Sequence, residues 1–277
     1  MTGEARRSVV SADGTRIEFR QLGSGPGLIL VHGGMGASQN LVNLAAELAN
    51  EFELLVPDRR GRGRSGPHGQ AYGIAREAED LLAIAADTGA TRVFGLSSGA
   101  LVTLEAARRS AALAKIALYE PPLSAGGSVP TGWLPRFDRE IAAGRTTSAL
   151  ITALKGARLE PTMARLPRAL LRPMFALAPR LRPAPVDDIP IHDLVPTMHF
   201  DMRLVREMAD TTAAYANIDA DVLLLGGGKS PAYLRASLDA LEGALPRSQR
   251  VMLPALGHTG PEDRPEQVAE VLRPFFH

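Results

Sequence analysis

The chain of 277 residues contains no cysteine, so disulfides, thiolate nucleophiles and cysteine-ligated metals are excluded. Lysine occurs only at Lys115, Lys155 and Lys229, and aromatic residues make up 5% of the chain, with a single tryptophan. The formal net charge is +1, so no overall field attracts nucleic acid or an anionic membrane surface. No apolar run approaches the roughly eighteen residues that indicate a membrane span. We therefore expect neither a nucleic-acid nor a membrane partner.

The amino terminus, MTGEARRSVVSADG, lacks the apolar core of a secretory signal, so a cytoplasmic location is expected. Apolar residues make up 45% of the chain and charged residues 22%, which are ordinary values for a globular protein with a sizeable core. The length suits one large domain, or a core with an inserted segment. Nothing in the sequence indicates the oligomeric state.

Short apolar runs alternate with amphipathic stretches along most of the chain. Residues 6–21 predict a β-hairpin, and GLILVHGG (27–34) predicts a buried strand. Further strands are expected at 52–58, 91–95, 115–120 and 221–228, and a strand followed by a loop at 249–258, with helices at 41–50, 76–89, 98–110, 232–245 and 264–276. This alternation indicates an α/β fold in which mostly parallel strands are joined by crossover helices.

The alternation stops between residues 121 and 212, where prolines recur among short amphipathic pieces and no stretch has the pattern of a strand. We interpret this segment as a helical cap inserted into a core made of residues 1–120 and 213–277. Some of its apolar side chains should line a pocket for a mid-sized apolar substrate. The residues expected to line this pocket are Met35, Trp133, Phe137, Met174, Phe175, Met198 and Phe200, and Met163 and Met202 are further apolar residues of the same amphipathic pieces.

GLSSG at residues 95–99 matches the pattern G-x-S-x-G, with Ser97 in the position of a nucleophile. A predicted strand precedes it and a predicted helix follows, so the serine would lie on a sharp turn at the positive end of the helix. The flanking glycines would let the backbone double back. The backbone N–H of Ser98 is then one expected donor of an oxyanion hole, and Gly34, or alternatively Met35, supplies the second.

A serine hydroxyl needs a base, and His258 is the best placed of the six histidines. It follows the last predicted strand in ALGHTGP, on the side of the sheet where Ser97 is expected. His32, in VHGGMG, is expected to fix the loop that carries the oxyanion donors. The remaining histidines are expected at the surface or in the core, and these are His68, His192, His199 and His277.

The motifs VHGG, DRRGRGRS, GLSSGA, LLLGGGKSP and LPALGHT occur in an order and spacing that resemble the α/β-hydrolase superfamily over the whole chain. The resemblance implies an eight-stranded, mostly parallel sheet flanked by helices, a Ser97 nucleophile, a His258 base, a variable cap near residues 121–212 and no cofactor. Many members carry an aspartate after the seventh strand, where this chain has Ser230. Another branch places the acid after the sixth strand, where this chain has Glu120 in ALYEPPL.

Glu120 could stabilise the imidazolium of the base, or it could only end a strand; we favour the first, because no other carboxylate follows a strand on that edge. GGGKS (226–230) is not a phosphate-binding loop, since the required glycine is replaced by Leu223. RRGRGRS (59–65) has no interleaved aromatic residues for base stacking and is interpreted as a structural turn. No histidine pair has metal-ligand spacing, so no metal site is predicted, and IHDL and MHFDM (191–202) are interpreted as cap-helix packing.

The combined pattern predicts a serine hydrolase that cleaves an ester, lactone or thioester with apolar groups through an acyl-enzyme on Ser97. Two alternatives stay open. The same residues support cyclisation, elimination or carbon–carbon bond chemistry on a natural-product intermediate, and this fold can also bind a small molecule without turnover. Dehalogenation and epoxide opening are disfavoured, because those relatives need aspartate at the position of Ser97.

Overall fold

An eight-stranded sheet forms the centre of the chain, in the order β1-β2-β4-β3-β5-β6-β7-β8. The computed structural model describes residues 4–159, 165–181 and 187–277. The strands are β1 (Ala5–Val10), β2 (Arg16–Gly23), β3 (Gly27–Val31), β4 (Glu53–Pro57), β5 (Arg92–Leu96), β6 (Lys115–Tyr119), β7 (Asp221–Gly227) and β8 (Ser248–Leu253). β2 pairs antiparallel with β1 and β4, and every other neighbouring pair is parallel. The mostly parallel sheet predicted from the sequence is confirmed.

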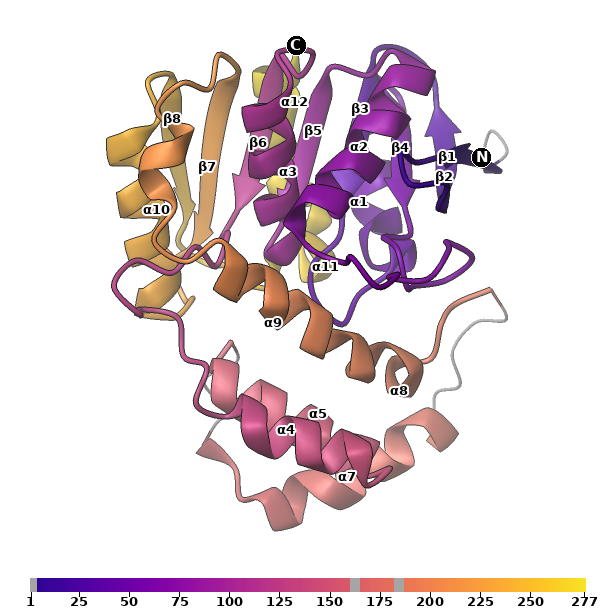
Figure 1. Cartoon of the computed structure of the whole chain (residues 1–277), viewed down its shortest axis with the longest axis vertical. Coiled ribbons are helices and arrows are strands. Elements are labelled where there is room, and N and C mark those ends of the chain that lie inside the picture. Colours follow the sequence, from indigo (N-terminus) through magenta and orange to yellow (C-terminus); the bar gives the residue numbers. More distant parts are fainter. Residues whose placement is uncertain (1–3, 160–164, 182–186) are drawn as a thin grey trace.

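The central strands are continuous apolar runs because helices cover both faces of the sheet. In β3, Leu28, Ile29 and Leu30 are all fully buried, with Ile29 in one core layer and its two neighbours in the other. Helices α2 (Ile74–Thr88), α3 (Ser98–Arg109) and α10 (Ala232–Ala244) contribute to the first layer, and α1 (Val42–Leu48) and α12 (Pro265–Phe276) to the second (Figure 1). Two short helices, η1 (Ser38–Leu41) and α11 (Gly260–Asp263), lie in loops. None of the helices in the described ranges is both long and apolar enough to cross a membrane.

Residues 121–212 enter the chain between β6 and β7 and are called the helical insertion below. Its described part contains α4 (Leu134–Ala142), α5 (Thr146–Ala157), α7 (Arg168–Leu181), α8 (Ile191–Leu194), η2 (Val195–Thr197), α9 (Met198–Glu207) and η3 (Thr212–Tyr215), and no strand. Figure 1 shows α9 between the sheet and a layer made of α4, α5 and α7. Glu207, at the end of α9, accepts the N–H of Ile74 at 3.0 Å and so caps the first turn of α2 in the core.

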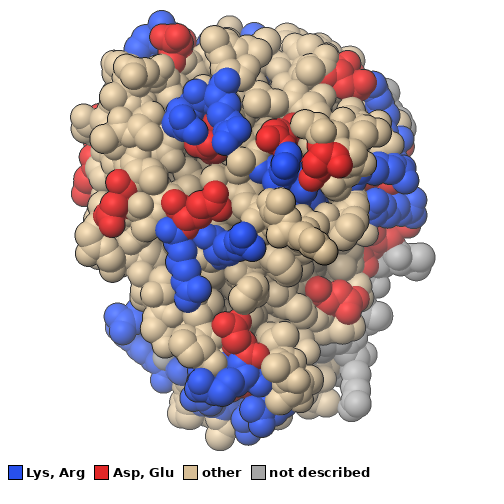
Figure 2. Space-filling model, viewed as in Figure 1, with Lys and Arg blue, Asp and Glu red and all other residues tan. Residues whose placement is uncertain are grey.

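Charged side chains of both signs are interspersed over the part of the surface formed by the sheet and its helices (Figure 2). At the end of the molecule formed by α4, α5 and α7, basic side chains predominate on the same face. Arg136 and Arg139 of α4 are both exposed. The small net charge of the chain therefore conceals an uneven distribution.

The strand order determines where a site can form. The chain leaves β3 for β4 on one side of it and returns to β5 on the other. The carboxyl ends of β3 and β5 therefore border a crevice, which is the usual place for a ligand in an open α/β sheet. Gly34 follows β3 and Ser97 follows β5, and the helical insertion lies over this edge (Figure 1).

Candidate active site

Ser97 joins β5 to α3 with φ 54° and ψ −121°, a backbone conformation that residues with a side chain rarely adopt. The flanking glycines explain why the turn can form. A Cβ atom on Gly99 would lie 2.4 Å from the carbonyl oxygen of His32, and one on Gly95 would lie 2.6 Å from Cα of Ala100. The serine side chain itself is half-buried.

Glu120 follows β6, is 0% exposed and contacts His258 directly. Its Oε2 accepts a hydrogen bond from Nδ1 of His258 at 2.7 Å, and its Oε1 accepts the N–H of Gly227 at 2.6 Å. The loop before the histidine is fixed in turn, because the hydroxyl of Tyr119 donates to the carbonyl of Gly257 at 2.7 Å. With its Nδ1 proton directed at the carboxylate, the imidazole keeps a lone pair on Nε2.

Ser230 follows β7, at the position where the resemblance implied an aspartate in many members. It is buried, and its hydroxyl has no hydrogen-bond partner within the described ranges. Asp219 and Asp221 lie at the amino end of β7, at the edge opposite to Gly227. Among the described carboxylates, the one in ion-pair contact with the imidazole of His258 is therefore the one after β6.

A narrow pocket lies at the carboxyl edge of the sheet, with about 40 Å³ of space for water-sized molecules. The core contributes Gly34, Ser97, Ser98 and His258 to its lining. The helical insertion contributes an apolar wall that includes Val129, Pro130, Trp133, Met198, Met202 and Val205. Residues from three loops that are far apart in the sequence thus meet around one small space.

Trp133 and Met198 line this pocket, but other apolar residues expected beside them do not. Phe137 is fully buried behind Trp133, and the two ring centroids are 5.7 Å apart. Met174 is 44% exposed on the outer surface of α7. The expectation was wrong for these two residues, because an amphipathic pattern shows which side chains share a helix face but not what covers that face.

Phe175, Phe200 and Met35 are partly buried against the core and also lie outside the lining of the pocket. Phe200 stacks instead on the ring of His68, with centroids 3.6 Å apart. Met163 lies outside the described residues. Fewer of the expected apolar side chains therefore line the pocket than the sequence indicated.

His32 holds the loop that follows β3, as its position in VHGGMG suggested. Its Nδ1 contacts the carbonyl of Gly33 at 2.9 Å, and its Nε2 accepts the N–H of Arg59 at 3.2 Å. Burial and the charges of Arg62 and Arg59 hold the pKa of His32 well below its usual range, so the ring is neutral. A neutral ring can accept one hydrogen bond and donate another, and this pair of contacts requires both.

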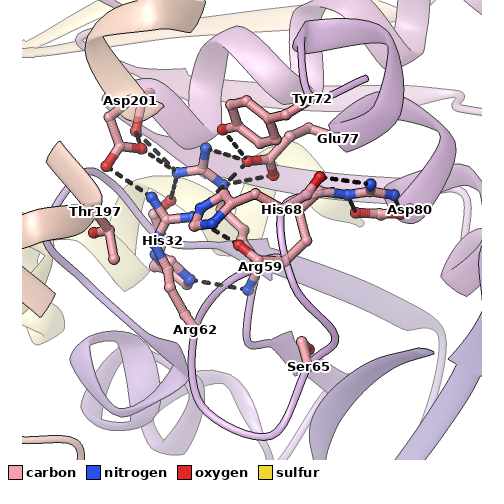
Figure 3. Close-up of polar contacts among 12 residues, drawn as sticks. His32, Arg59, Arg62, Ser65, His68, Tyr72, Glu77, Asp80, Thr197 and Asp201 are labelled. Atoms are coloured by element: carbon pink, nitrogen blue, oxygen red, sulfur yellow. Dashed lines mark hydrogen bonds and ion pairs between the residues drawn. The ribbon is translucent and has the colours of Figure 1, made fainter. Parts of the chain in front are cut away.

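A cluster of buried charges beside the pocket was not expected from the sequence (Figure 3). Arg59 donates from Nε and Nη2 to the carboxylate of Glu77, at 2.9 Å each, and from Nη1 to Asp201 of α9 at 2.9 Å. Arg62 donates from Nη2 to the other oxygen of Asp201 at 2.7 Å. Asp201 lines the pocket as well. The run of arginines in RRGRGRS was a signal for such a cluster, since buried guanidinium groups need carboxylate partners.

Residues 28–271 match the model of the Alpha/beta hydrolase family, which covers most of the chain. The chain is an α/β hydrolase. This hydrolase is 32% identical to an α/β hydrolase from Sphaerobacter thermophilus, and the two structures agree with a TM-score of 0.80 over 98% of this chain and 100% of that one. An esterase from a Rhodococcus species is 24% identical, with a TM-score of 0.74 over 98% of each chain, and this likeness shows the fold. The resemblance found in the motifs is confirmed.

Curated relatives match the hydrolase over shorter segments. N-formylmaleamate deformylase from Pseudomonas putida is 37% identical over 124 residues, which are 43% of this chain and 46% of the relative. An uncharacterised hydrolase from Bacillus subtilis is 39% identical over 97 residues, or 33% of this chain and 35% of the relative. The matched segments therefore span less than half the length of these curated relatives.

Proposed function

We propose that this α/β hydrolase is a serine hydrolase that cleaves an ester, lactone or thioester with a short apolar acyl group through an acyl-enzyme on Ser97. One observation carries the proposal: the buried Glu120–His258 contact of 2.7 Å adjoins the pocket that Ser97 lines. A base oriented by a carboxylate next to a strained serine is the arrangement that nucleophilic acyl transfer requires.

In the proposed reaction, Nε2 of His258 takes the proton of Ser97 while Oγ forms a bond to the substrate carbonyl carbon. Glu120 stabilises the resulting imidazolium through its contact with Nδ1. The N–H groups of Gly34 and Ser98 hold the oxyanion. The imidazolium then protonates the leaving alcohol or thiol as the carbonyl bond re-forms. Water, deprotonated by the same imidazole, attacks the acyl group and restores the serine.

The helical insertion acts as the cap that selects the acyl group in this proposal. Its contribution to the pocket is mostly apolar, which favours uncharged acyl chains. The pocket is small and bordered by bulky side chains such as Trp133, so we expect acetyl esters to react faster than longer ones. Trp133 is the single tryptophan of the protein and is half-buried, and its indole limits the length of the acyl group that fits.

The first test is turnover of p-nitrophenyl acetate and butyrate, together with labelling by a fluorophosphonate probe and peptide mapping of the label. We expect the label on Ser97 and its loss in Ser97→Ala. The matched control is Ser230→Ala, which removes a different serine hydroxyl at the same edge of the sheet and should leave labelling intact. A folded native chain that neither labels nor turns over any ester would contradict the proposal, as would activity that survives Ser97→Ala. The deformylase relative supports adding an N-formyl amide to the substrate panel.

A further inference from the structure

One carboxylate of the helical insertion contacts every residue that the sequence marked for the oxyanion hole. Oδ1 of Asp201 accepts a hydrogen bond from the hydroxyl of Ser98 at 2.9 Å, and Oδ2 accepts one from the N–H of Met35 at 3.4 Å. A Cβ atom on Gly34 would lie 3.2 Å from the same Oδ2, so the carboxylate packs directly against that glycine. Because the amide of Met35 is engaged in this way, Gly34 is the better second donor.

A negative charge beside an oxyanion hole would oppose the charge that develops there, unless it is neutralised. Here it is neutralised by Arg59 at 2.9 Å and Arg62 at 2.7 Å, each on a different oxygen of Asp201 (Figure 3). Burial alone would raise the pKa of Asp201, but the charges of Arg62 and Arg59 lower it, so the carboxylate stays ionised. Its side chain is 2% exposed, which leaves solvent little part in its hydrogen bonding.

The same cluster links α9 to the start of α3 through the core. Arg59 is fixed on one side by two bonds to Glu77, which also accepts the hydroxyl proton of Tyr72 at 2.7 Å. On its other side, Nη1 of Arg59 contacts both Asp201 and the hydroxyl of Ser98, the latter at 3.0 Å. The side chain of Ser98, the residue after the nucleophile, is therefore held by Arg59 of the core and by Asp201 of the insertion.

We propose that Asp201 is a positioning residue that couples the docking of α9 to the geometry of the oxyanion hole. The inference rests on the proposed function, because it assigns Gly34 and Ser98 the role of donors. When α9 is seated, its carboxylate orders the loop after β3 and the first turn of α3 together. When α9 is displaced, Ser98 loses its acceptor and two buried guanidinium groups lose a counter-ion. The insertion thus affects the chemical step as well as the fit of the substrate.

The alternative is that Asp201 only stabilises the fold, and a second buried carboxylate separates the two roles. Asp80 of α2 is 5% exposed and accepts hydrogen bonds from Arg60 at 2.7 and 2.6 Å. Asp80 lies on the opposite side of the cluster from Asp201 in Figure 3, and it does not line the pocket. Asp80→Asn and Asp201→Asn each remove one buried carboxylate charge that is paired with arginine, Arg60 in the first case and Arg59 and Arg62 in the second. Burial raises the pKa of Asp80 to about 6, so assays at pH 8 compare two ionised groups.

The experiment measures kcat and KM for p-nitrophenyl acetate, and denaturant unfolding, in both variants. Misplacing an oxyanion donor should cost less than deleting one, so we expect Asp201→Asn to lower kcat about tenfold to a hundredfold with KM nearly unchanged. Asp80→Asn should keep kcat within about threefold of the native value, even if it lowers the free energy of unfolding by as much as Asp201→Asn does. Equal losses of kcat in the two variants, or a change in KM alone, would overturn the inference.

A second readout does not depend on turnover. In spectra of protein labelled with ¹⁵N-serine, the amide resonance of Ser98 should move in Asp201→Asn and stay in place in Asp80→Asn. An unmoved resonance in Asp201→Asn refutes the positioning role, whereas a native chain without any turnover refutes the proposed function. If Asp201→Asn does not fold, Ser98→Ala cuts one contact and keeps the backbone donor. It should lower kcat about threefold to tenfold, and an unchanged kcat would contradict the inference.

Discussion

Replacing Glu120 by glutamine tests the proposed triad most directly, because the local hydrogen bonds dictate how the amide must lie. The N–H of Gly227 donates to Oε1 at 2.6 Å, so the glutamine oxygen is retained on that side. The new NH₂ group then faces Nδ1 of His258, where a hydrogen-bond acceptor lay at 2.7 Å. The imidazole can accept that bond only by moving its proton to Nε2. In this tautomer Nε2 carries the proton and has no free lone pair with which to deprotonate Ser97.

The expected loss is large. Removing the same charge from a serine-protease triad lowers kcat by about ten-thousandfold, so we expect a decrease of about a thousandfold to ten-thousandfold here, or about 4 to 5.5 kcal/mol. The assay is steady-state hydrolysis of p-nitrophenyl acetate, with circular dichroism as the check on folding. Ser230→Ala is the control and should keep kcat within about threefold of the native value. A folded Glu120→Gln protein that retains a tenth of its kcat would refute this assignment of the acid.

Three further predictions concern the turn, the aromatic stack and the pocket. Gly99→Ala forces a Cβ atom against the carbonyl of His32 and should lower the free energy of unfolding by about 1–3 kcal/mol in denaturant titrations; an unchanged midpoint would mean that the turn tolerates a side chain. Burial, with a contribution from a nearby arginine, lowers the pKa of His68 from 6.5 to about 4, so the folded chain binds fewer protons than the unfolded chain between these values. The free energy of unfolding should therefore fall by about 1–2 kcal/mol as the pH is lowered from 6.5 toward 4, a figure reduced for solvent screening of the half-buried ring. His68→Phe preserves stacking on Phe200 and should flatten this pH dependence. Trp133→Ala should raise the ratio of kcat/KM for hexanoate over acetate by about tenfold, and a constant ratio would show that the indole does not limit chain length.

The fold was predictable because its signals are local. A buried strand, a glycine turn and an amphipathic helix each occupy a short stretch, and the sheet order follows from how such units join. Gly95, just before Ser97, illustrates this, since a Cβ atom there would meet Cα of Ala100 and the carbonyl oxygen of Gly99, which are backbone atoms of the same turn. The roles of Ser97, His258 and Glu120 were proposed on the same local grounds and stay predictions until they are measured.

The pocket wall and the charge cluster depend on contacts between distant segments, and these carry little local signal. Met174 and Leu171 lie on one amphipathic helix, yet the first is exposed and the second is buried. MHFDM was interpreted as helix packing, which accounts for Phe200 but not for Asp201. Its partner Arg62 lies 139 positions earlier in a run interpreted as a turn. Neither segment by itself indicates its partner, because an ion pair can be recognised only when the positions of both charged side chains are known.

Helix α9 is fastened to the core by acidic side chains near both of its ends, Asp201 on the arginines and Glu207 on the first turn of α2. No ion pair between described residues joins α4, α5 or α7 to the core, and these helices lie beyond α9 (Figure 1). The outer layer is held instead by apolar packing and by the hydroxyl of Tyr233, which donates to the carbonyl of Ala157 in α5 at 2.9 Å. Grafting the outer layer of a related enzyme onto an unchanged α9 should alter which acyl groups are accepted while preserving the machinery beneath, whereas a graft that includes α9 should sacrifice both.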